Sequence, residues 1–302
     1  MHKILLFGAQ GQLGWELRRA LMPLGSVTAL DIPHLDIRDQ AALSQAVLAC
    51  RPNVIVNATA YTAVDQAESE PEIAMAINGQ APRHLAELAL KMGAALIHFS
   101  TDYVFDGTKG SPYVESDPPN PLSVYAASKL AGEQAISQVG GAYLIFRTSW
   151  LYSLRRDSFV VKVLRWSRQQ EVLRVVADQI SNPTWARALA EAIAQVLAMG
   201  GHEVVDWLRE RRGVYHLAGD GYASRLEWAQ AILRLDPRIE EQRVRELLPA
   251  LTSEFPTPAV RPLFSALDCT CFTNTFGLRL PAWEEALQLA MQEDCYNPLA
   301  LK

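Results

Sequence analysis

Short apolar runs alternate with longer amphipathic stretches through the first half of the chain. The apolar runs lie at 4–7, 27–30, 54–56, 94–99 and 143–146. They are continuous rather than alternating, which is typical of strands covered on both faces. Helical patterns near 12–22, 39–49, 72–92 and 122–138 separate them. This succession predicts an α/β fold, a Rossmann-like doubly wound parallel sheet with right-handed crossovers.

The second half of the chain is less regular. Helical patterns near 157–169, 185–199, 224–235 and 282–293 are separated by short strands at 172–176 and 214–217. Proline is frequent from Pro249 to Pro262, where we expect loops rather than central strands. We predict that residues 1–150 form mainly a Rossmann domain. Residues 151–302 then form mainly a smaller C-terminal substrate-binding part, with some segments returning to the Rossmann core.

Composition narrows the class of protein. The chain has 302 residues, a net charge of −5 and 49% hydrophobic residues. No apolar run approaches the roughly 20 residues of a membrane span. The four cysteines include no CxxC pair, so no structural zinc is implied. We expect a cytoplasmic globular protein that has neither a membrane nor nucleic acid as its partner.

A glycine-rich turn follows the first strand. Gly8, Gly11 and Gly14 open the first predicted helix, where backbone amides can face a pyrophosphate. Asp31 ends the second strand and is placed to bind an adenosine ribose. Its charge would repel a 2′-phosphate and so favours NADH, whereas Arg38 could accommodate NADPH. The cofactor is therefore predicted to be NADPH or NADH, with the preference open.

Further cofactor-binding candidates lie at the ends of the strands, which line the ligand crevice in open α/β sheets. Asp36 and Ile37 could lie against the adenine, although Asp36 could equally be an ordinary helix-entry residue. The predicted cofactor set also contains Gln12, Leu13, Ala58, Thr59, Ala60, Ser100, Tyr125 and Lys129.

The chemistry is predicted to centre on Tyr125 and Lys129. Positions i and i+4 share one helix face, so we expect the ammonium to lie near the phenol and lower its pKa. A tyrosine tuned in this way is a candidate proton donor to a carbonyl oxygen. Thr101, at the end of the fourth strand, is placed to hydrogen-bond the same oxygen, and Lys129 could also reach the nicotinamide ribose.

Two further features suggest a substrate pocket. The strand that we expect to end at Trp150 brings a large aromatic ring to the same rim, where it forms either core or, with Tyr103, a wall for a ring-shaped ligand. Arg261 lies in a proline-stiffened loop. It is either a clamp for a diphosphate or a solvated surface arginine.

Six motifs together resemble the dTDP-4-dehydrorhamnose reductase family of the extended short-chain dehydrogenases/reductases. They are GAQGQLG at 8–14, NATAYTAVDQAE at 57–68, STDYVFDG at 100–107, PLSVYAASKLAGE at 121–133, RTSWLY at 147–152 and PTPAVRP at 256–262. The Tyr-x-x-x-Lys pair alone would indicate only the superfamily. STDYVFDG, NATAYTAVD and RTSW together are specific to this branch, and the resemblance extends nearly from end to end.

The resemblance implies reduction of the C4 ketone of dTDP-4-dehydro-6-deoxy-L-mannose to dTDP-L-rhamnose by NADPH or NADH. This is the last step of dTDP-rhamnose biosynthesis. It also implies a catalytic trio of Thr101, Tyr125 and Lys129. The substrate-binding positions are then Val64, Thr101, Tyr103, Tyr125, Trp150 and Arg261.

One departure from the family concerns a metal site. Some members bind magnesium between subunits through three glutamates, and the matching positions here are Glu16, Arg187 and Glu293. Arginine cannot ligate a cation, so we predict no metal site. An ion pair between Arg187 and these carboxylates could hold a dimer instead. Monomer and homodimer both remain open.

Two alternatives remain. The same branch resembles the regulatory subunit of methionine adenosyltransferase, which would need the glycine loop but not the acid. Retention of Thr101, Tyr125 and Lys129 together argues against that alternative. The other alternative is a reductase that makes a different dTDP-6-deoxysugar, because the sequence does not determine the stereochemistry at C4.

Overall fold

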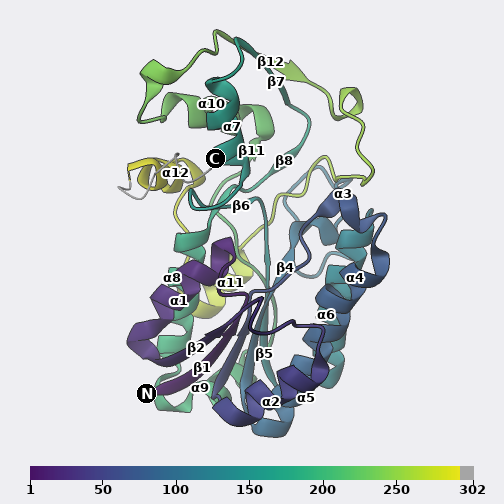
Figure 1. The fold of residues 1–302 in the computed structure, drawn as a ribbon, viewed down its shortest axis with the longest axis vertical. Helices are drawn as coiled ribbons and strands as arrows, with labels where there is room; N and C mark the ends of the chain where they lie inside the picture. Colours follow the sequence, from purple (N-terminus) through teal and green to yellow (C-terminus); the bar gives the residue numbers. More distant parts are fainter. Residues whose placement is uncertain (293–302) are drawn as a thin grey trace.

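The structure, a computed structural model, describes residues 1–292 and is built on a six-stranded parallel sheet (Figure 1). The strand order is β10-β5-β4-β3-β1-β2. The chain moves outward from β1 to β2 and then continues on the other side of β1, so the order reverses beside β1 as in doubly wound folds. The predicted fold class is confirmed. The strands are β1 (His2–Phe7), β2 (Gly25–Leu30), β3 (Val54–Asn57), β4 (Ala95–Thr101), β5 (Ala142–Thr148) and β10 (Gly213–His216).

The central strands are apolar throughout because both faces of the sheet are covered. Along β1, Ile4 and Leu6 join one hydrophobic cluster, whereas Leu5 and Phe7 join the cluster on the opposite face. This alternation is the period of two expected of a strand. The continuous apolar runs in the sequence therefore reflect a sheet between two helical layers.

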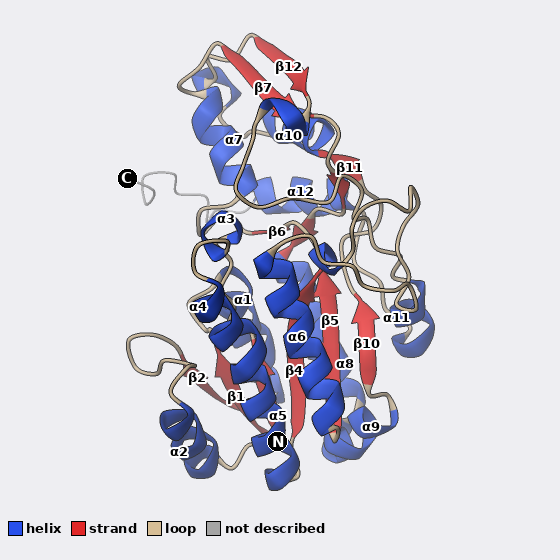
Figure 2. Cartoon of the chain, turned by 90° about the vertical axis from the view of Figure 1, so that its right-hand side faces the viewer, coloured by secondary structure: helices blue, strands red, loops and turns tan. Residues whose placement is uncertain are grey.

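Each face of the sheet has its own helical layer (Figures 1 and 2). The buried residues of α1 (Gln12–Leu21), α8 (Ala186–Met199), α9 (Val204–Glu210) and α11 (Thr270–Phe276) join the cluster on one face. Those of α2 (Gln40–Cys50), α5 (Ala81–Met92) and α6 (Val124–Val139) join the other. Residues from beyond position 150 thus return to the main sheet as β10, α8, α9 and α11.

A smaller part lies beyond the carboxyl ends of the strands (Figure 2). Its core contains buried residues of α7 (Phe159–Ser167), α10 (Arg225–Arg234) and α12 (Trp283–Gln292). The parallel pair of β7 (Val172–Val176) and β12 (Glu246–Ala250) lies at its far end. Shorter elements complete the chain: α3 (Val64–Ala67), α4 (Pro71–Met75), β6 (Leu151–Tyr152), β8 (Ile180–Ser181), β9 (Thr184–Trp185) and β11 (Ala223–Ser224).

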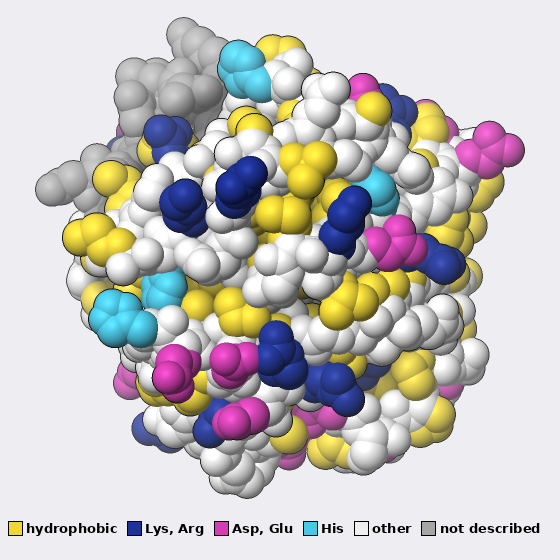
Figure 3. Space-filling view, turned by 90° about the horizontal axis from the view of Figure 1, so that it is seen from below, with side chains coloured by type: hydrophobic (Ala, Val, Ile, Leu, Met, Phe, Trp, Pro, Cys, Tyr) yellow, Lys and Arg dark blue, Asp and Glu magenta, His cyan; other side chains and the backbone are white. Residues whose placement is uncertain are grey.

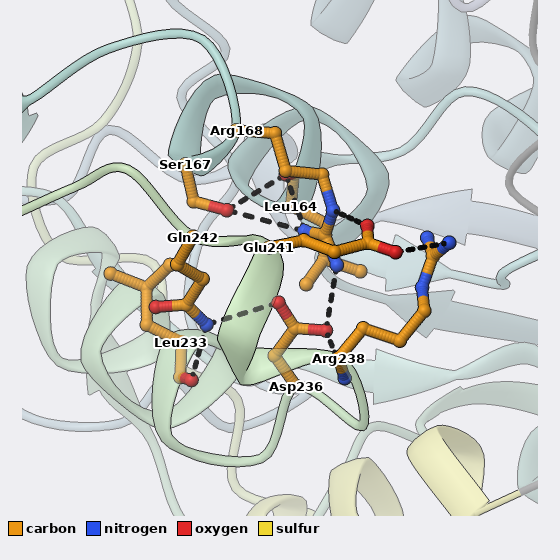
Figure 4. Close-up of polar contacts among 8 residues, drawn as sticks. All are labelled: Leu164, Ser167, Arg168, Leu233, Asp236, Arg238, Glu241 and Gln242. Atoms are coloured by element: carbon orange, nitrogen blue, oxygen red, sulfur yellow. Dashed lines mark hydrogen bonds and ion pairs between the residues drawn. The ribbon is translucent and has the colours of Figure 1, made fainter.

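A polar cluster fixes the end of α7 against the segment that follows α10 (Figure 4). Arg168 donates to Asp236 Oδ1 at 2.9 Å and to Glu241 Oε2 at 3.0 Å. Gln242 Nε2 bonds the other Asp236 oxygen at 3.0 Å and the Leu233 carbonyl at 2.9 Å. Because the Asp236 side chain is fully buried, these donors compensate a desolvated carboxylate.

Two sequence predictions about elements need correction. The helix expected at 72–92 is α4 and α5 joined by a π-helical turn at Ala76–Gln80. Pro82, near the start of α5, has no amide hydrogen for the regular helical bond, which favours a wider turn there. The prediction of a loop around Pro249 is wrong for that residue, because Pro249 lies in the strand β12. A two-stranded sheet has only edge strands, and these tolerate proline.

The described residues contain no membrane-spanning helix, and the face drawn in Figure 3 carries charged side chains of both signs. None of the helices within residues 1–292 combines the length and the apolar character needed to cross a membrane. On the face seen from below, the described basic and acidic side chains are interspersed (Figure 3).

Candidate active site

A cavity of about 980 Å³ is lined by residues at the carboxyl ends of the central strands and by residues of the smaller part. The structure brings together almost all predicted site residues around it. Gly14 and Arg261 are the two that do not line it. Those that do are Gly8, Gly11, Gln12, Leu13, Asp31, Asp36, Ile37, Ala58, Thr59, Ala60, Val64, Ser100, Thr101, Tyr103, Tyr125, Lys129 and Trp150.

The glycine loop leaves a cradle that side chains would fill. Gly8 has φ +80°, and a Cβ placed on it would lie 2.7 Å from the carbonyl carbon of Ala58. A Cβ on Gly14 would lie 1.9 Å from the Gly8 carbonyl oxygen, so Gly14 permits close packing of α1 against the loop. In the described chain, no side chain caps the amino terminus of α1, and its first turn holds no acidic residue. Its amides suit a pyrophosphate.

The ribose end of the cavity carries both predicted determinants. Asp31 accepts hydrogen bonds from the backbone amides of Gln10 at 2.7 Å and Ile32 at 2.8 Å, which fixes its carboxylate. Arg38 bonds Asp36 at 2.5 Å, and this bond holds the pKa of Asp36 below its usual value. Asp36 is not the helix-entry residue, because Asp39 caps α2. An acceptor for hydroxyls and a cation for a phosphate therefore lie at the same wall.

The candidate catalytic residues come from β4 and α6. Thr101 is the last residue of β4, and Tyr125 lies in the first turn of α6, which Ser123 caps. The Thr101 side chain hydrogen-bonds Tyr125. The Tyr103 ring stands nearly perpendicular to that of Tyr125, with centroids 6.2 Å apart. A hydroxyl pair thus faces the cavity beside an aromatic wall.

The predicted effect of Lys129 on Tyr125 is wrong for this arrangement. Burial raises the pKa of Tyr125, and the hydrogen bond with Thr101 opposes this effect only in part. Lys129 donates instead to the Phe99 carbonyl at 2.6 Å. Burial lowers the Lys129 pKa to about 8, against a raising effect of Glu133. Tyr125 therefore stays a protonated acid at neutral pH.

A buried ion pair lies behind Lys129, one turn further along α6. Glu133 accepts from Ser100 Oγ at 2.5 Å and from Arg147 Nη2 at 2.7 Å. All three side chains are buried. The pair ties α6 to β4 and β5, and it holds the helix face that presents Tyr125 and Lys129.

Asp102 is a buried carboxylate that the sequence reasoning missed. It accepts hydrogen bonds from Thr101 at 3.2 Å, Ser181 at 3.0 Å and Ser265 at 2.5 Å. Burial raises its pKa to about 6 despite these donors. Asp102 therefore links the catalytic threonine to two segments of the second half of the chain, and only the fold brings those partners together.

The aromatic wall differs from the predicted strand end. β5 stops at Thr148, and Trp150 lies beyond it with φ +38°. The Trp150 ring stacks on Trp228, with centroids 5.4 Å apart, and the Arg225 guanidinium lies 3.7 Å from its centre. Arg225 lines the cavity and was also missed. The only sequence signal for it is a cation beside a tryptophan in RLEW, a pattern that ordinary surface helices share.

Arg261 does not itself line the cavity, although it interacts with the cavity residue Tyr103. Its guanidinium donates to both carboxylate oxygens of Asp65, at 2.9 and 2.7 Å, and also to Thr257 and the Ala259 carbonyl. These donors are engaged within the protein, and the diphosphate clamp stays a prediction.

Arg187 and Glu16, two of the residues considered for a dimer contact, form an ion pair within one chain, and monomer and homodimer both stay open. Arg187 Nε donates to Glu16 Oε2 at 3.2 Å. Glu293 lies outside the described residues. Within the described chain, no cluster of His, Cys, Asp or Glu is arranged to hold a metal ion.

Comparisons with known proteins identify the family of the chain. The family described as RmlD substrate binding domain matches residues 1–295. A dTDP-4-dehydrorhamnose reductase of Burkholderia thailandensis is 41% identical, covering 96% of this chain and 98% of its own. The crystal structure of the Clostridium acetobutylicum reductase superimposes with a TM-score of 0.87 at 34% identity, covering 95% of this chain and 98% of that one. The crystal structure of the Bacillus anthracis reductase in complex with NADP superimposes with a TM-score of 0.85 at 36% identity, and it covers the same shares of the two chains.

Proposed function

Because the chain belongs to the dTDP-4-dehydrorhamnose reductase family, we propose that it reduces the C4 ketone of dTDP-4-dehydro-6-deoxy-L-mannose to dTDP-L-rhamnose with NADPH or NADH. The family match covers nearly the whole chain. The alignments with dTDP-4-dehydrorhamnose reductases likewise cover nearly the full length of those proteins. The observation that carries the chemistry is one cavity lined by the glycine loop, Thr101, Tyr125 and Lys129.

The residues present fit a nicotinamide dinucleotide. Gly8 and the uncapped start of α1 suit the pyrophosphate, and Asp31 and Arg38 suit the adenosine end. When bound, the reduced nicotinamide supplies the hydride. Since both determinants of the ribose site are present, NADPH and NADH both remain proposed cofactors.

The proton is proposed to come from Tyr125. Its raised pKa keeps the phenol protonated, so it can donate to the C4 oxygen as negative charge develops there. The Thr101 hydroxyl orients the same oxygen. Lys129 is proposed to hold the nicotinamide ribose and to keep a positive charge behind the site while negative charge develops on the C4 oxygen. Val64, Tyr103 and Trp150 are proposed to contact the sugar.

Replacing the acid tests this proposal. We expect Tyr125→Phe to lower kcat for dTDP-4-dehydrorhamnose by about 10²- to 10⁴-fold, the usual contribution of a positioned acid. Tyr222→Phe is the matched control, because Tyr222 is exposed and does not line the cavity. NADPH oxidation measures the rate, and NMR identifies the product. Near-wild-type turnover in Tyr125→Phe would exclude Tyr125 as the acid.

The two alternatives make different predictions in the same assay. A regulatory subunit would oxidise no NAD(P)H with any dTDP-keto-sugar and would bind a synthetase partner in fixed stoichiometry. A reductase for another deoxysugar would give a product with different C4 stereochemistry. The oligomeric state, the absence of nucleic acid and the cytoplasmic location stay predictions.

A further inference from the structure

Arg225 is a cation without an ion-pair partner in an aromatic surrounding. Its guanidinium carbon lies 3.7 Å from the centre of Trp150, 4.8 Å from that of Phe159 and 5.5 Å from that of Trp228. Across residues 1–292, Arg225 forms no ion pair with a carboxylate, although the Asp102 carboxylate lies near enough to favour its charge. Burial lowers the pKa of Arg225, so its surroundings disfavour its charge. A ligand anion would offset this cost.

The guanidinium uses its face for the aromatic contacts and keeps its edge for hydrogen bonds. The guanidinium carbon lies over the Trp150 ring at 3.7 Å from its centre, and the five N–H donors of an arginine point outward in the guanidinium plane. One of them bonds the Tyr103 hydroxyl. The remaining edge donors suit a group with several acceptor oxygens. Arg261 differs, because Asp65, Thr257 and Ala259 already occupy its donors.

Arg225 lies where two cavities meet. A second cavity of about 280 Å³ shares Trp150, Leu151 and Arg225 with the large one. Lys162 of α7 brings another cation to its wall, with only a 3.4 Å contact to the exposed carboxylate of Asp157. The smaller cavity therefore extends the candidate sugar site into a compartment bordered by two cations.

The geometry at Trp150 leaves one ring face for a ligand. Arg225 and Trp228 lie 3.7 and 5.4 Å from the centre of Trp150, but only 5.5 Å from each other. If Arg225 and Trp228 lay on opposite faces of Trp150, the distance between them would be clearly longer than the distance of either group from the Trp150 centre. They therefore lie on the same side of the ring. The other face of Trp150 is not covered by either group.

We propose that Arg225, assisted by Lys162, binds the diphosphate that joins the nucleoside to the sugar. This inference rests on the proposed function, because it assumes a nucleoside diphosphate sugar as the substrate. The diphosphate is then bound by Arg225 at the start of α10 and by Lys162 of α7. The diphosphate then lies beside Trp150, while the C4 end of the sugar faces Tyr125.

Titration of dTDP and of thymidine into the wild-type protein and four variants tests the assignment. The variants are Arg225→Gln, Arg225→Lys, Lys162→Gln and, as matched control, Arg245→Gln, whose side chain is exposed and remote from both cavities. Wild-type protein is the reference. Loss of charge-assisted hydrogen bonds is expected to weaken dTDP binding about 10- to 100-fold in Arg225→Gln. The loss is smaller in Lys162→Gln, and Arg225→Lys recovers part of the affinity.

Three further readouts separate binding from folding. Thymidine affinity, NADPH affinity and Tm are expected to match wild type in Arg225→Gln, whereas KM for the keto-sugar rises more than kcat falls. Unchanged dTDP affinity in Arg225→Gln overturns the proposal, as does an equal loss of thymidine, NADPH or thermal stability. A wild-type protein that binds dTDP through Arg225 but does not reduce dTDP-4-dehydrorhamnose keeps the anion site and rejects the proposed function.

Discussion

Lys129 holds an ammonium in a place where water cannot solvate it. The side chain is buried, and its Nζ group donates to the Phe99 carbonyl. Burial lowers the pKa to about 8, although the nearby Glu133 carboxylate favours the charged form. The charge of Lys129 is therefore lost just above neutral pH, whereas Tyr125, whose pKa is raised, stays protonated.

This difference predicts which group limits activity at alkaline pH. We expect kcat/KM to fall as the pH rises through about 8, because the cation behind Tyr125 disappears. Stability should change in the opposite direction. In the unfolded chain the lysine pKa is about 10.4, so between about pH 8 and pH 10 the unfolded state binds more protons than the folded state. Raising the pH through this range therefore increases the free energy of unfolding.

Rate and denaturation profiles between about pH 6 and pH 10 test both expectations. Lys129→Met should lower activity throughout and remove both pH dependences. A wild-type kcat/KM that stays level up to about pH 10 would contradict the assigned role of Lys129.

At this scale, the sequence predicted the residues of the site better than their interactions. The i,i+4 spacing placed Tyr125 and Lys129 on one face of α6, because local helix geometry determines it. The partner of Lys129 is the Phe99 carbonyl, which depends on how α6 lies against β4. Asp102 and Arg225 were missed for the same reason, since their contacts come from segments far apart in the chain.

Among the elements, the approach of α1 to the glycine loop sets the shape of the dinucleotide end. Gly14 lies within α1, directly against the Gly8 carbonyl, and is not itself at the cavity wall. Its role is therefore to let the helix come close. Such a role is expected to show in stability as well as in cofactor affinity.

We predict that Gly14→Ala destabilises the protein by about 1–3 kcal/mol, the usual cost of overpacking. Alanine favours helices over glycine by about 1 kcal/mol, so helix propensity alone predicts the opposite sign. The displaced loop should also weaken NADPH binding. Gly213→Ala is the control, because a Cβ there meets its nearest atom, in the Tyr215 ring, at 3.8 Å. If Gly14→Ala kept the Tm and the cofactor Kd of the wild-type protein, α1 could move away from the loop without loss of stability or of cofactor binding.

Elements were predictable where one segment carries its own signal. The buried strands β1, β3 and β5 are continuous apolar runs, and α8 has a clear amphipathic period. The two-residue strands β6, β8, β9 and β11 carry no periodicity, because two residues cannot show one. They exist through their partners in the tertiary structure.

Across the whole molecule, the core of the main sheet draws on both parts of the chain, in line with the expectation that some segments after residue 150 return to the Rossmann core. One face of the main sheet is covered by α8, α9 and α11, all from later in the chain. Four side chains of α8 alone are fully buried there: Leu189, Ile193, Val196 and Leu197. At about 1.5–3 kcal/mol each, they contribute roughly 6–12 kcal/mol, comparable to the entire stability of a typical domain.

We therefore predict that a fragment of residues 1–150 does not fold on its own, although it contains the glycine loop and the Tyr125–Lys129 pair. Without β10 and α8, β5 becomes an exposed edge and one apolar face of the sheet meets water. We expect the fragment to bind a hydrophobic dye and to unfold without cooperativity in urea, whereas the intact chain unfolds cooperatively. A sharp transition and NADPH binding by the fragment would instead establish residues 1–150 as an independent domain.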